Sequence, residues 1–294
     1  MSGIPRAYMA WRLGAPGLMV SLFVAPLTAQ LGVGGDVTMP SRYVWRGVTR
    51  SQAVVVQPSL FLATGGARDS LRAGIWTSWD LSTTGADQLS DRGPGRDGRT
   101  EANVWVLYQR EQGTTSLAAG AIGYRFRQDG PVAQRSDRWN TTELYGSVQA
   151  RGLRFAPRLD AWWDVDRVRG WYFEASAGVP VLGNIEGVPF WAVYLRALAG
   201  YSAGQERNRR RPEELAYFAS PGLTHVLFSV SSNFAIPGIK VESLRDRVTL
   251  MLDFNTQINR DRRTKVTNAA TPPSEKGVKF WLSLTAAVPA ARLF

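Results

Sequence analysis

The chain has 294 residues, a formal net charge of +11, a single histidine and no cysteine. The absence of cysteine excludes disulfides, thiol nucleophiles and cysteine-ligated metal sites. With one histidine and no closely spaced carboxylate motif, the sequence predicts neither a metal site nor a cofactor.

Residues 1–29 have the features of a secretory signal peptide. Arg6 and Arg12 give a positive start, residues 13–27 are mostly apolar, and small residues precede a cleavage site after Ala29. The apolar run is short for a membrane anchor and contains two prolines. An exported chain seldom meets nucleic acid, so we expect its positive charge to attract an anionic surface or anionic solutes rather than nucleic acid.

Beyond residue 29, apolar and polar residues alternate with the period of a β-strand. In chain order, strands are expected at 33–46, 54–62, 71–80, 101–109, 117–127, 141–150, 154–165, 171–180, 188–200, 223–236, 248–259 and 278–288. Most have the length that a tilted strand needs to cross a bilayer, and none approaches a membrane-spanning helix of about 18 apolar residues.

Alternation alone also fits a soluble β-sandwich, but three features favour a membrane barrel. Short connections alternate with long polar ones, and the chain ends on Phe294 after an alternating strand, as in substrates of the barrel-assembly machinery. Aromatic residues lie near strand ends, where interfacial girdles form: Tyr43, Trp45, Trp79, Tyr108, Tyr124, Phe126, Trp163, Trp171 and Phe280.

The predicted fold is therefore all-β: a transmembrane antiparallel β-barrel of about 12 strands, with roughly 10 or 14 as alternatives. The barrel covers residues 30–294, follows a cleavable signal peptide and lies in the bacterial outer membrane. Phe280, Leu282 and Leu284 should face lipid, and Lys279, Trp281 and Ser283 the lumen. The last strand should pair with the first, which closes the barrel.

The stretch Ser-Arg-Tyr-Val-Trp-Arg-Gly-Val-Thr-Arg-Ser at 41–51, followed by Gln57-Pro58-Ser59-Leu60, resembles the opening of the TorF-type porins of Proteobacteria and related bacteria. The step Gly222-Leu223-Thr224-His225 is similar to a later feature of that family. The match covers residues 41–62, and the basic loops depart from the family pattern. The resemblance implies an outer-membrane barrel with a transport role.

If the apolar face of each strand meets lipid, the other face lines the lumen. The pore-lining candidates are Arg42, Arg46, Arg72, Arg125, Arg127, Arg154, Arg158, Arg196, Asp80, Glu143 and Asp160. Arg42 and Arg46 are expected on the first strand, with Arg46 at the outer mouth and Gly47 at the turn. Two interpretations stay open: a narrow pore whose arginines guide anions, or a lumen closed by salt bridges and by Trp76, Trp105, Tyr145, Trp162 and Tyr172.

Two connections carry clusters of arginine: Arg207, Arg209, Arg210 and Arg211 in one, and Arg260, Arg262 and Arg263 in the other. Guanidinium groups match phosphate oxygens, so these side chains are candidates for contact with lipopolysaccharide. The alternative is a solvated loop whose charge is partly cancelled by nearby carboxylates.

An enzymatic role is not expected. Some outer-membrane barrels hydrolyse phospholipids with a serine and a histidine two residues apart on one strand, but the residue two positions after His225 is Leu227. Ser229 is four residues along, about 13 Å away, too far to be activated. The sequence favours a passive channel for small, anionic or zwitterionic solutes, with a structural or adhesion barrel bound to outer-membrane lipid and lipopolysaccharide as the alternative.

Overall fold

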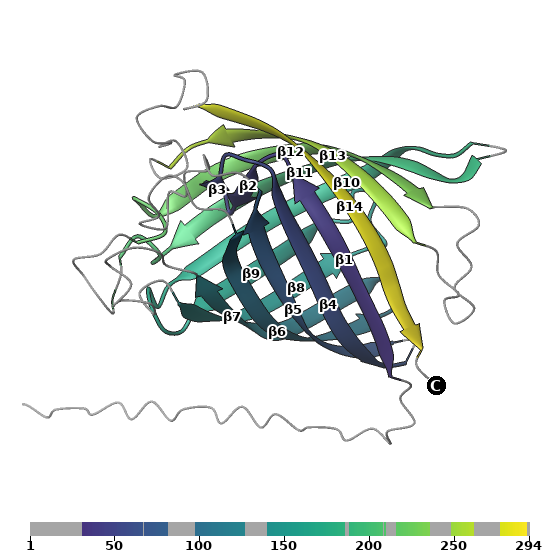
Figure 1. Ribbon diagram of the computed structural model, residues 1–294, viewed down its shortest axis with the longest axis horizontal. Coiled ribbons are helices and arrows are strands. Elements are labelled where there is room, and N and C mark those ends of the chain that lie inside the picture. The colour runs from purple at the N-terminus through teal and green to yellow at the C-terminus, as the bar shows by residue number, and fades with distance from the viewer. Residues whose placement is uncertain are drawn as a thin grey trace, which may run out of the picture.

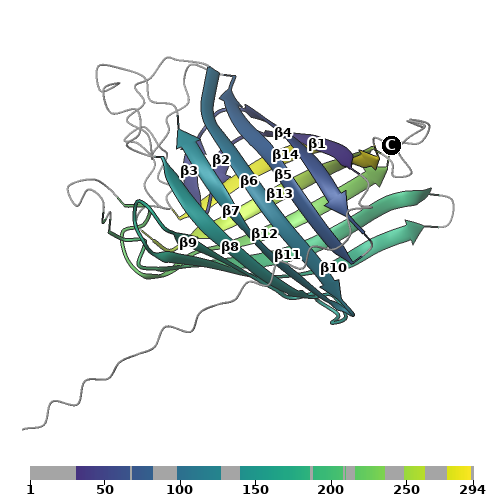
Figure 2. The same ribbon diagram turned by 90° about the horizontal axis from the view of Figure 1, so that it is seen from below.

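The computed structural model describes residues 31–66, 68–81, 98–126, 140–185, 188–207, 209, 216–235, 248–261 and 277–292. These residues form a closed, antiparallel 12-strand barrel with a two-stranded hairpin (Figures 1 and 2). In chain order the barrel strands are β1 (Gly32–Pro40), β4 (Val55–Gly65), β5 (Asp69–Asp80), β6 (Gly98–Gln112), β7 (Thr115–Phe126), β8 (Thr141–Ala150), β9 (Arg158–Asp164), β10 (Trp171–Ile185), β11 (Val188–Ala203), β12 (Gly222–Ala235), β13 (Thr249–Asn259) and β14 (Val278–Arg292). The hairpin consists of β2 (Tyr43–Trp45) and β3 (Val48–Ser51).

Pairing between the first and last strands closes the barrel. β1 pairs with β14 from Gly32 opposite Arg292 to Pro40 opposite Ser283, and its other edge pairs with β4. Closure leaves no unpaired sheet edge in a medium without water, as a membrane requires. The predicted fold class and closure are confirmed. The predicted signal peptide at 1–29 and Phe294 lie outside the described residues.

The outer wall is apolar and the inner wall polar, because successive side chains of a strand point to opposite faces. On β14, Phe280 and Leu282 are 57% and 50% exposed, whereas Lys279 and Ser283 are buried. Outward aromatic side chains near strand ends include Trp79, Trp163 and Trp171, and the last two stack with ring centres 5.4 Å apart. The predicted orientation of β14 and these members of the aromatic girdle are confirmed. No described helix is long and apolar enough to cross a membrane.

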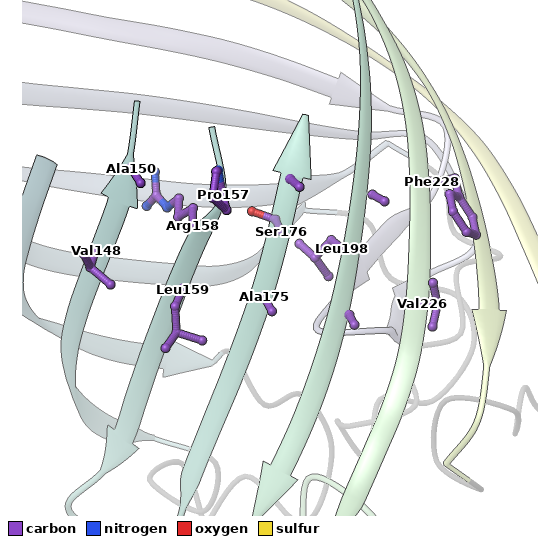
Figure 3. Close-up of a pocket in the computed structure, with 13 residues that line it drawn as sticks. Val148, Ala150, Pro157, Arg158, Leu159, Ala175, Ser176, Leu198, Val226 and Phe228 are labelled. Atoms are coloured by element: carbon purple, nitrogen blue, oxygen red, sulfur yellow. The ribbon is translucent and has the colours of Figure 1, made fainter. Parts of the chain in front are cut away.

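A shallow apolar groove of about 690 Å³ crosses the outer wall over β8 to β12 (Figure 3). Its floor contains the small side chains of Ala175, Ala177, Ala197 and Ala199, and Leu159 and Phe228 are among the larger residues that line it. This groove belongs to the lipid-facing surface and is separate from the lumen.

The prediction that the first strand continues to residue 46 is wrong. β1 ends at Pro40, which has no N–H with which to continue the ladder. The chain then forms the β2–β3 hairpin, in which Trp45 pairs with Val48 across Arg46 and Gly47. These two residues have φ of 48° and 82°, as a two-residue type I′ turn requires.

Four aromatic residues predicted for the girdle lie inside the barrel instead. Tyr43 and Trp45 belong to the hairpin, and Tyr124 and Phe126 are buried on the inward face of β7. The Trp45 and Tyr124 rings meet edge to face at 6.1 Å. An aromatic residue at a strand end suits an interface with lipid, but it suits equally an interior filled by an inward-folded hairpin.

Candidate functional site

The β2–β3 hairpin occupies the barrel interior at the end opposite the chain termini, here called the outer end (Figures 1 and 2). It connects β1 to β4, and its residues Val48, Thr49, Arg50 and Ser51 are buried. Together with residues 216–218 of the connection from β11 to β12, it forms what we call the plug. The outer half of the lumen is therefore a packed core.

Arg46, at the tip of the hairpin, is held by one wall of the barrel. Its guanidinium donates two hydrogen bonds to the Glu143 carboxylate on β8, at 2.7 and 2.5 Å. The same group lies 4.5 to 4.8 Å from the ring centres of Trp45, Trp162 and Tyr172. A bidentate ion pair inside an aromatic cage compensates the cost of burying this cation.

The next residue anchors the hairpin to the other side of the barrel. The Gly47 carbonyl accepts hydrogen bonds from Gln257 Nε2 on β13 at 2.8 Å and from Lys279 Nζ on β14 at 3.1 Å. At the base of the hairpin, Tyr43 donates to Glu101 on β6, and Arg50 lies 4.4 Å above the Phe126 ring. The hairpin is thus fastened to strands on several sides of the lumen.

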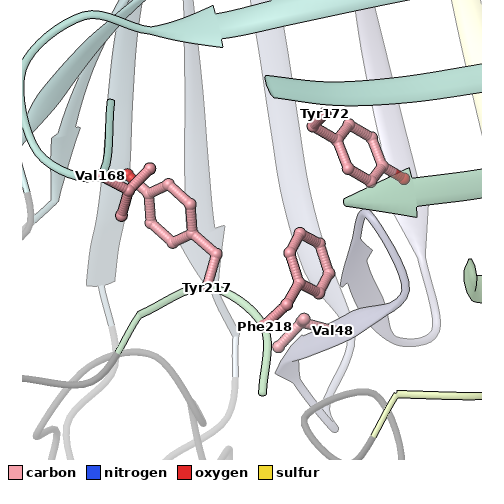
Figure 4. Packing of buried hydrophobic residues seen from close by; sticks show 5 residues of the cluster. All are labelled: Val48, Val168, Tyr172, Tyr217 and Phe218. Atoms are coloured by element: carbon pink, nitrogen blue, oxygen red, sulfur yellow. The ribbon is translucent and has the colours of Figure 1, made fainter. Parts of the chain in front are cut away.

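Residues 216–218 complete the plug (Figure 4). Phe218 stacks on Tyr172, with ring centres 5.5 Å apart, and packs in one buried cluster with Val48, Val168 and Tyr217. The Tyr217 hydroxyl donates to Asp164 at the end of β9. This segment therefore joins the hairpin to the wall formed by β9 and β10.

The chain keeps the plug's donors protonated. Burial alone lowers the pKa of the Arg46 guanidinium, but the Glu143 carboxylate, with Tyr124 and Tyr172, raises it above its ordinary value. Burial, followed by the Glu101 carboxylate, raises the pKa of the Tyr43 hydroxyl well above its usual range. The hydrogen bonds that these groups donate therefore persist at neutral and moderately alkaline pH.

The half of the lumen nearer the termini is hollow. One cavity of about 460 Å³ is lined by residues of β6, β7, β8, β9, β10 and β11. A second, of about 530 Å³, reaches the turn between β8 and β9 at the terminal end. Arg158 and Arg196 line both cavities. We call the two cavities together the vestibule.

The predicted pore-lining residues separate into paired and unpaired groups. The structure brings Arg46 to Glu143, and Arg158 to Asp160 at 2.8 Å. Arg72 lies on the inward face of β5, 5.8 Å from the centre of the Phe61 ring, and Arg196 on β11 donates to Ser176 at 3.3 Å. Within the described part of the chain, neither Arg72 nor Arg196 forms an ion pair with a carboxylate.

Other predicted pore-lining residues lie elsewhere. Arg125 points outward from β7 and bonds the Tyr124 carbonyl, because the inward positions of this strand end are Tyr124 and Phe126. Arg154 is exposed in the turn that precedes β9, since that strand begins only at Arg158. The inward assignment of Arg125 was wrong, whereas Arg154 lines the second cavity of the vestibule from this turn. Arg42 lies between β1 and β2, Asp80 is buried at the outer end of β5, and Arg127 falls outside the described residues.

Some residues of the plug and of the wall that surrounds it were not foreseen from the sequence. Gln257 occupies an inward position of a correctly expected strand, so its orientation could have been read from the alternation. Tyr217 and Phe218 form an aromatic pair within a polar connection, which is the available signal for an inward-folded loop. His225 is buried, and its Nδ1 lies 3.0 Å from the Thr224 hydroxyl.

Arginines predicted to contact lipopolysaccharide lie in two connections at the outer end. Arg207, Arg209 and Arg260 are exposed. Arg210, Arg211, Arg262 and Arg263 lie outside the described residues.

Comparison with known proteins gives structural neighbours only. No protein-family model matches the chain, and no curated protein matches its sequence. The chain is similar to the COG4313 outer membrane channel from Pseudomonas putida F1, with 12% identity over 90% of this chain and 96% of that one, at a TM-score of 0.47. It is also similar to Acinetobacter baumannii OccAB2, with 9% identity over 89% of this chain and 98% of that one, at a TM-score of 0.37. A third neighbour is Pseudomonas aeruginosa OccK2 (OpdF), with 9% identity over 90% of this chain and 98% of that one, at a TM-score of 0.35.

The location of the chain follows from the barrel itself. A closed antiparallel barrel with an apolar exterior and a polar interior satisfies its backbone within the membrane and meets lipid through its side chains. This is an outer-membrane β-barrel.

Proposed function

We propose that the chain is a passive channel for small solutes in the bacterial outer membrane, closed at its outer end by the plug. The vestibule carries the proposal, because its two cavities share Arg158 and Arg196 and together extend from mid-barrel to the terminal end, as a path for solute would. A barrel with only a structural role has no need of such a cavity. We also propose that the chain performs no catalysis.

The resemblance to TorF-type porins supports the same function. Its best-matching residues, Tyr43, Arg46 and Gly47, form the hairpin that fills the outer lumen. We propose membership of that family, with the hairpin as the element that controls passage.

Two further partners belong to the proposal. Arg207, Arg209 and Arg260 are exposed at the outer end, which supports the proposal that they bind lipopolysaccharide phosphates. The C-terminal strand β14 closes the barrel and is the segment that the barrel-assembly machinery would recognise. A surface-adhesion barrel is the second candidate, and these exposed arginines favour it.

Conductance across a planar lipid bilayer tests the channel. The wild-type protein is compared with a variant in which residues 43–51 are replaced by glycine and serine, which removes every side-chain contact of the hairpin to the walls. We expect low conductance for the wild type and severalfold higher conductance for the variant. A matched control replaces the exposed residues 112–114 at the turn between β6 and β7, which line neither cavity, and should leave conductance unchanged. Equal, negligible conductance in all three proteins would favour the adhesion barrel.

A further inference from the structure

The vestibule contains a cation and a carboxylate that are close together but not paired. Arg196 Nη2 donates to the Ser176 hydroxyl at 3.3 Å, and Glu174 accepts a hydrogen bond from Tyr172 through Oε1. Neither group forms an ion pair with any described residue. Both side chains line the same cavity of about 460 Å³. The guanidinium can therefore donate further hydrogen bonds, and the carboxylate can accept them, when a solute enters this cavity.

The strand register gives their spacing. Glu174 and Ser176 are two residues apart on the inward face of β10, a step of about 7 Å. The Arg196 guanidinium donates to Ser176, so it is held beside the inward position that follows Glu174 on β10, and both side chains line the same cavity. The two opposite charges can thus be reached together by one small molecule.

The rest of the cavity favours a neutral but dipolar solute. Arg158, the other cation, is neutralised by Asp160, from which it is 2.8 Å away. The charges of Arg158, Arg196, Asp160 and Glu174 therefore sum to zero, and a simple anion drawn to Arg196 is repelled by Glu174. Trp105 and Trp162 also line the cavity and offer ring faces to alkyl or ammonium groups.

We propose that the vestibule is a binding site for small zwitterions that carry one carboxylate and one ammonium group. The solute carboxylate binds Arg196, and its ammonium group binds Glu174. The cavity has the size typical of small-molecule sites. That this ligand is also the transported solute rests on the channel function proposed above.

Isothermal titration calorimetry of the purified full-length protein tests the site with three matched probes. 4-Aminobutyrate carries both charges, butyrate lacks the ammonium group, and butylamine lacks the carboxylate. Each charge-assisted hydrogen bond adds about tenfold or more to affinity. We therefore expect 4-aminobutyrate to bind at least about tenfold more tightly than either single-charge probe.

Two variants assign the groups. Arg196→Gln should reduce 4-aminobutyrate affinity to that of butylamine, and Glu174→Gln should reduce it to that of butyrate. Arg110→Gln, on the exposed outer face of β6 and outside both cavities, is the control and should bind like the wild type. Equal affinity for the three probes, or 4-aminobutyrate binding that both variants retain, would overturn the proposal.

Calorimetry separates this site from the channel function, because binding needs no passage. A plug-free variant that conducts but shows no preference for 4-aminobutyrate refutes the site and leaves the channel intact. Preferential binding by a barrel that never conducts supports the site and refutes the channel.

Discussion

The two halves of the lumen share one inner wall, but they differ in whether a cationic side chain on that wall is buried and paired or exposed and unpaired. In the outer half, Arg46 and Glu143 are 9% and 0% exposed and pair within a cage of aromatic rings. In the terminal half, Arg196 is exposed to the vestibule and no described carboxylate pairs with it. Packing explains the difference: where the hairpin excludes water, a charge must be paired, and where water remains, a charge such as that of Arg196 can stay unpaired and available to a solute.

The largest expected effect comes from breaking the pair in the outer half. Glu143→Ala leaves a buried guanidinium without its carboxylate, which costs about 3–5 kcal/mol. We expect the unfolding midpoint in urea to fall, and the bilayer conductance to rise as the hairpin leaves the lumen.

A double variant shows whether the penalty comes from the unpaired charge. Arg46→Met combined with Glu143→Met removes both charges and should recover most of the lost stability, because apolar replacement of a buried pair is often neutral. If Glu143→Ala alone is as stable as the wild type, this ion pair does not hold the plug.

A second test compares the two faces of the wall in the terminal half. Leu252 is 46% exposed on the outer face of β13, and its neighbour Met251 lines the vestibule. Leu252→Lys places a charge in lipid and should cost up to about 2–4 kcal/mol, depending on depth. Met251→Lys places the same charge in water and should cost far less. Urea unfolding in lipid vesicles measures both, and equal losses would contradict the assignment of lipid and lumen faces.

Much of the wall could be predicted because the membrane imposes a simple rule on each strand. The segment expected at 141–150 coincides with β8, and the strands expected at 223–236 and 248–259 agree with β12 and β13 to within a residue. Alternation between lipid and lumen is a local property, so it can be read from consecutive residues.

The plug could not be predicted in the same way, because its contacts join residues distant in sequence. Arg46 was expected at an open mouth, yet its partner Glu143 lies 97 positions away. Alternation through Tyr43 and Trp45 continues that of β1, so the pattern does not distinguish a longer strand from a hairpin that folds inward. Arg125 was misplaced for a related reason. The inward positions at the end of β7 are aromatic because they pack against the plug, so the polar side chain of Arg125 lies on the outer face, where an apolar residue is expected.

The smallest expected effect comes from the backbone of the hairpin turn. Gly47 has a φ of 82°, and a Cβ in this left-handed region costs about 1–2 kcal/mol. Gly47→Ala should also move the carbonyl that accepts from Gln257 and Lys279, which loosens the plug and raises bilayer conductance modestly. Gly113→Ala is the matched control, because Gly113 has a φ of 59° in the turn between β6 and β7, at the terminal end. Both variants should lose similar stability in urea, but only Gly47→Ala should conduct more. A parallel rise in conductance for Gly113→Ala would show that general loosening of the barrel, rather than release of the plug, opens the path.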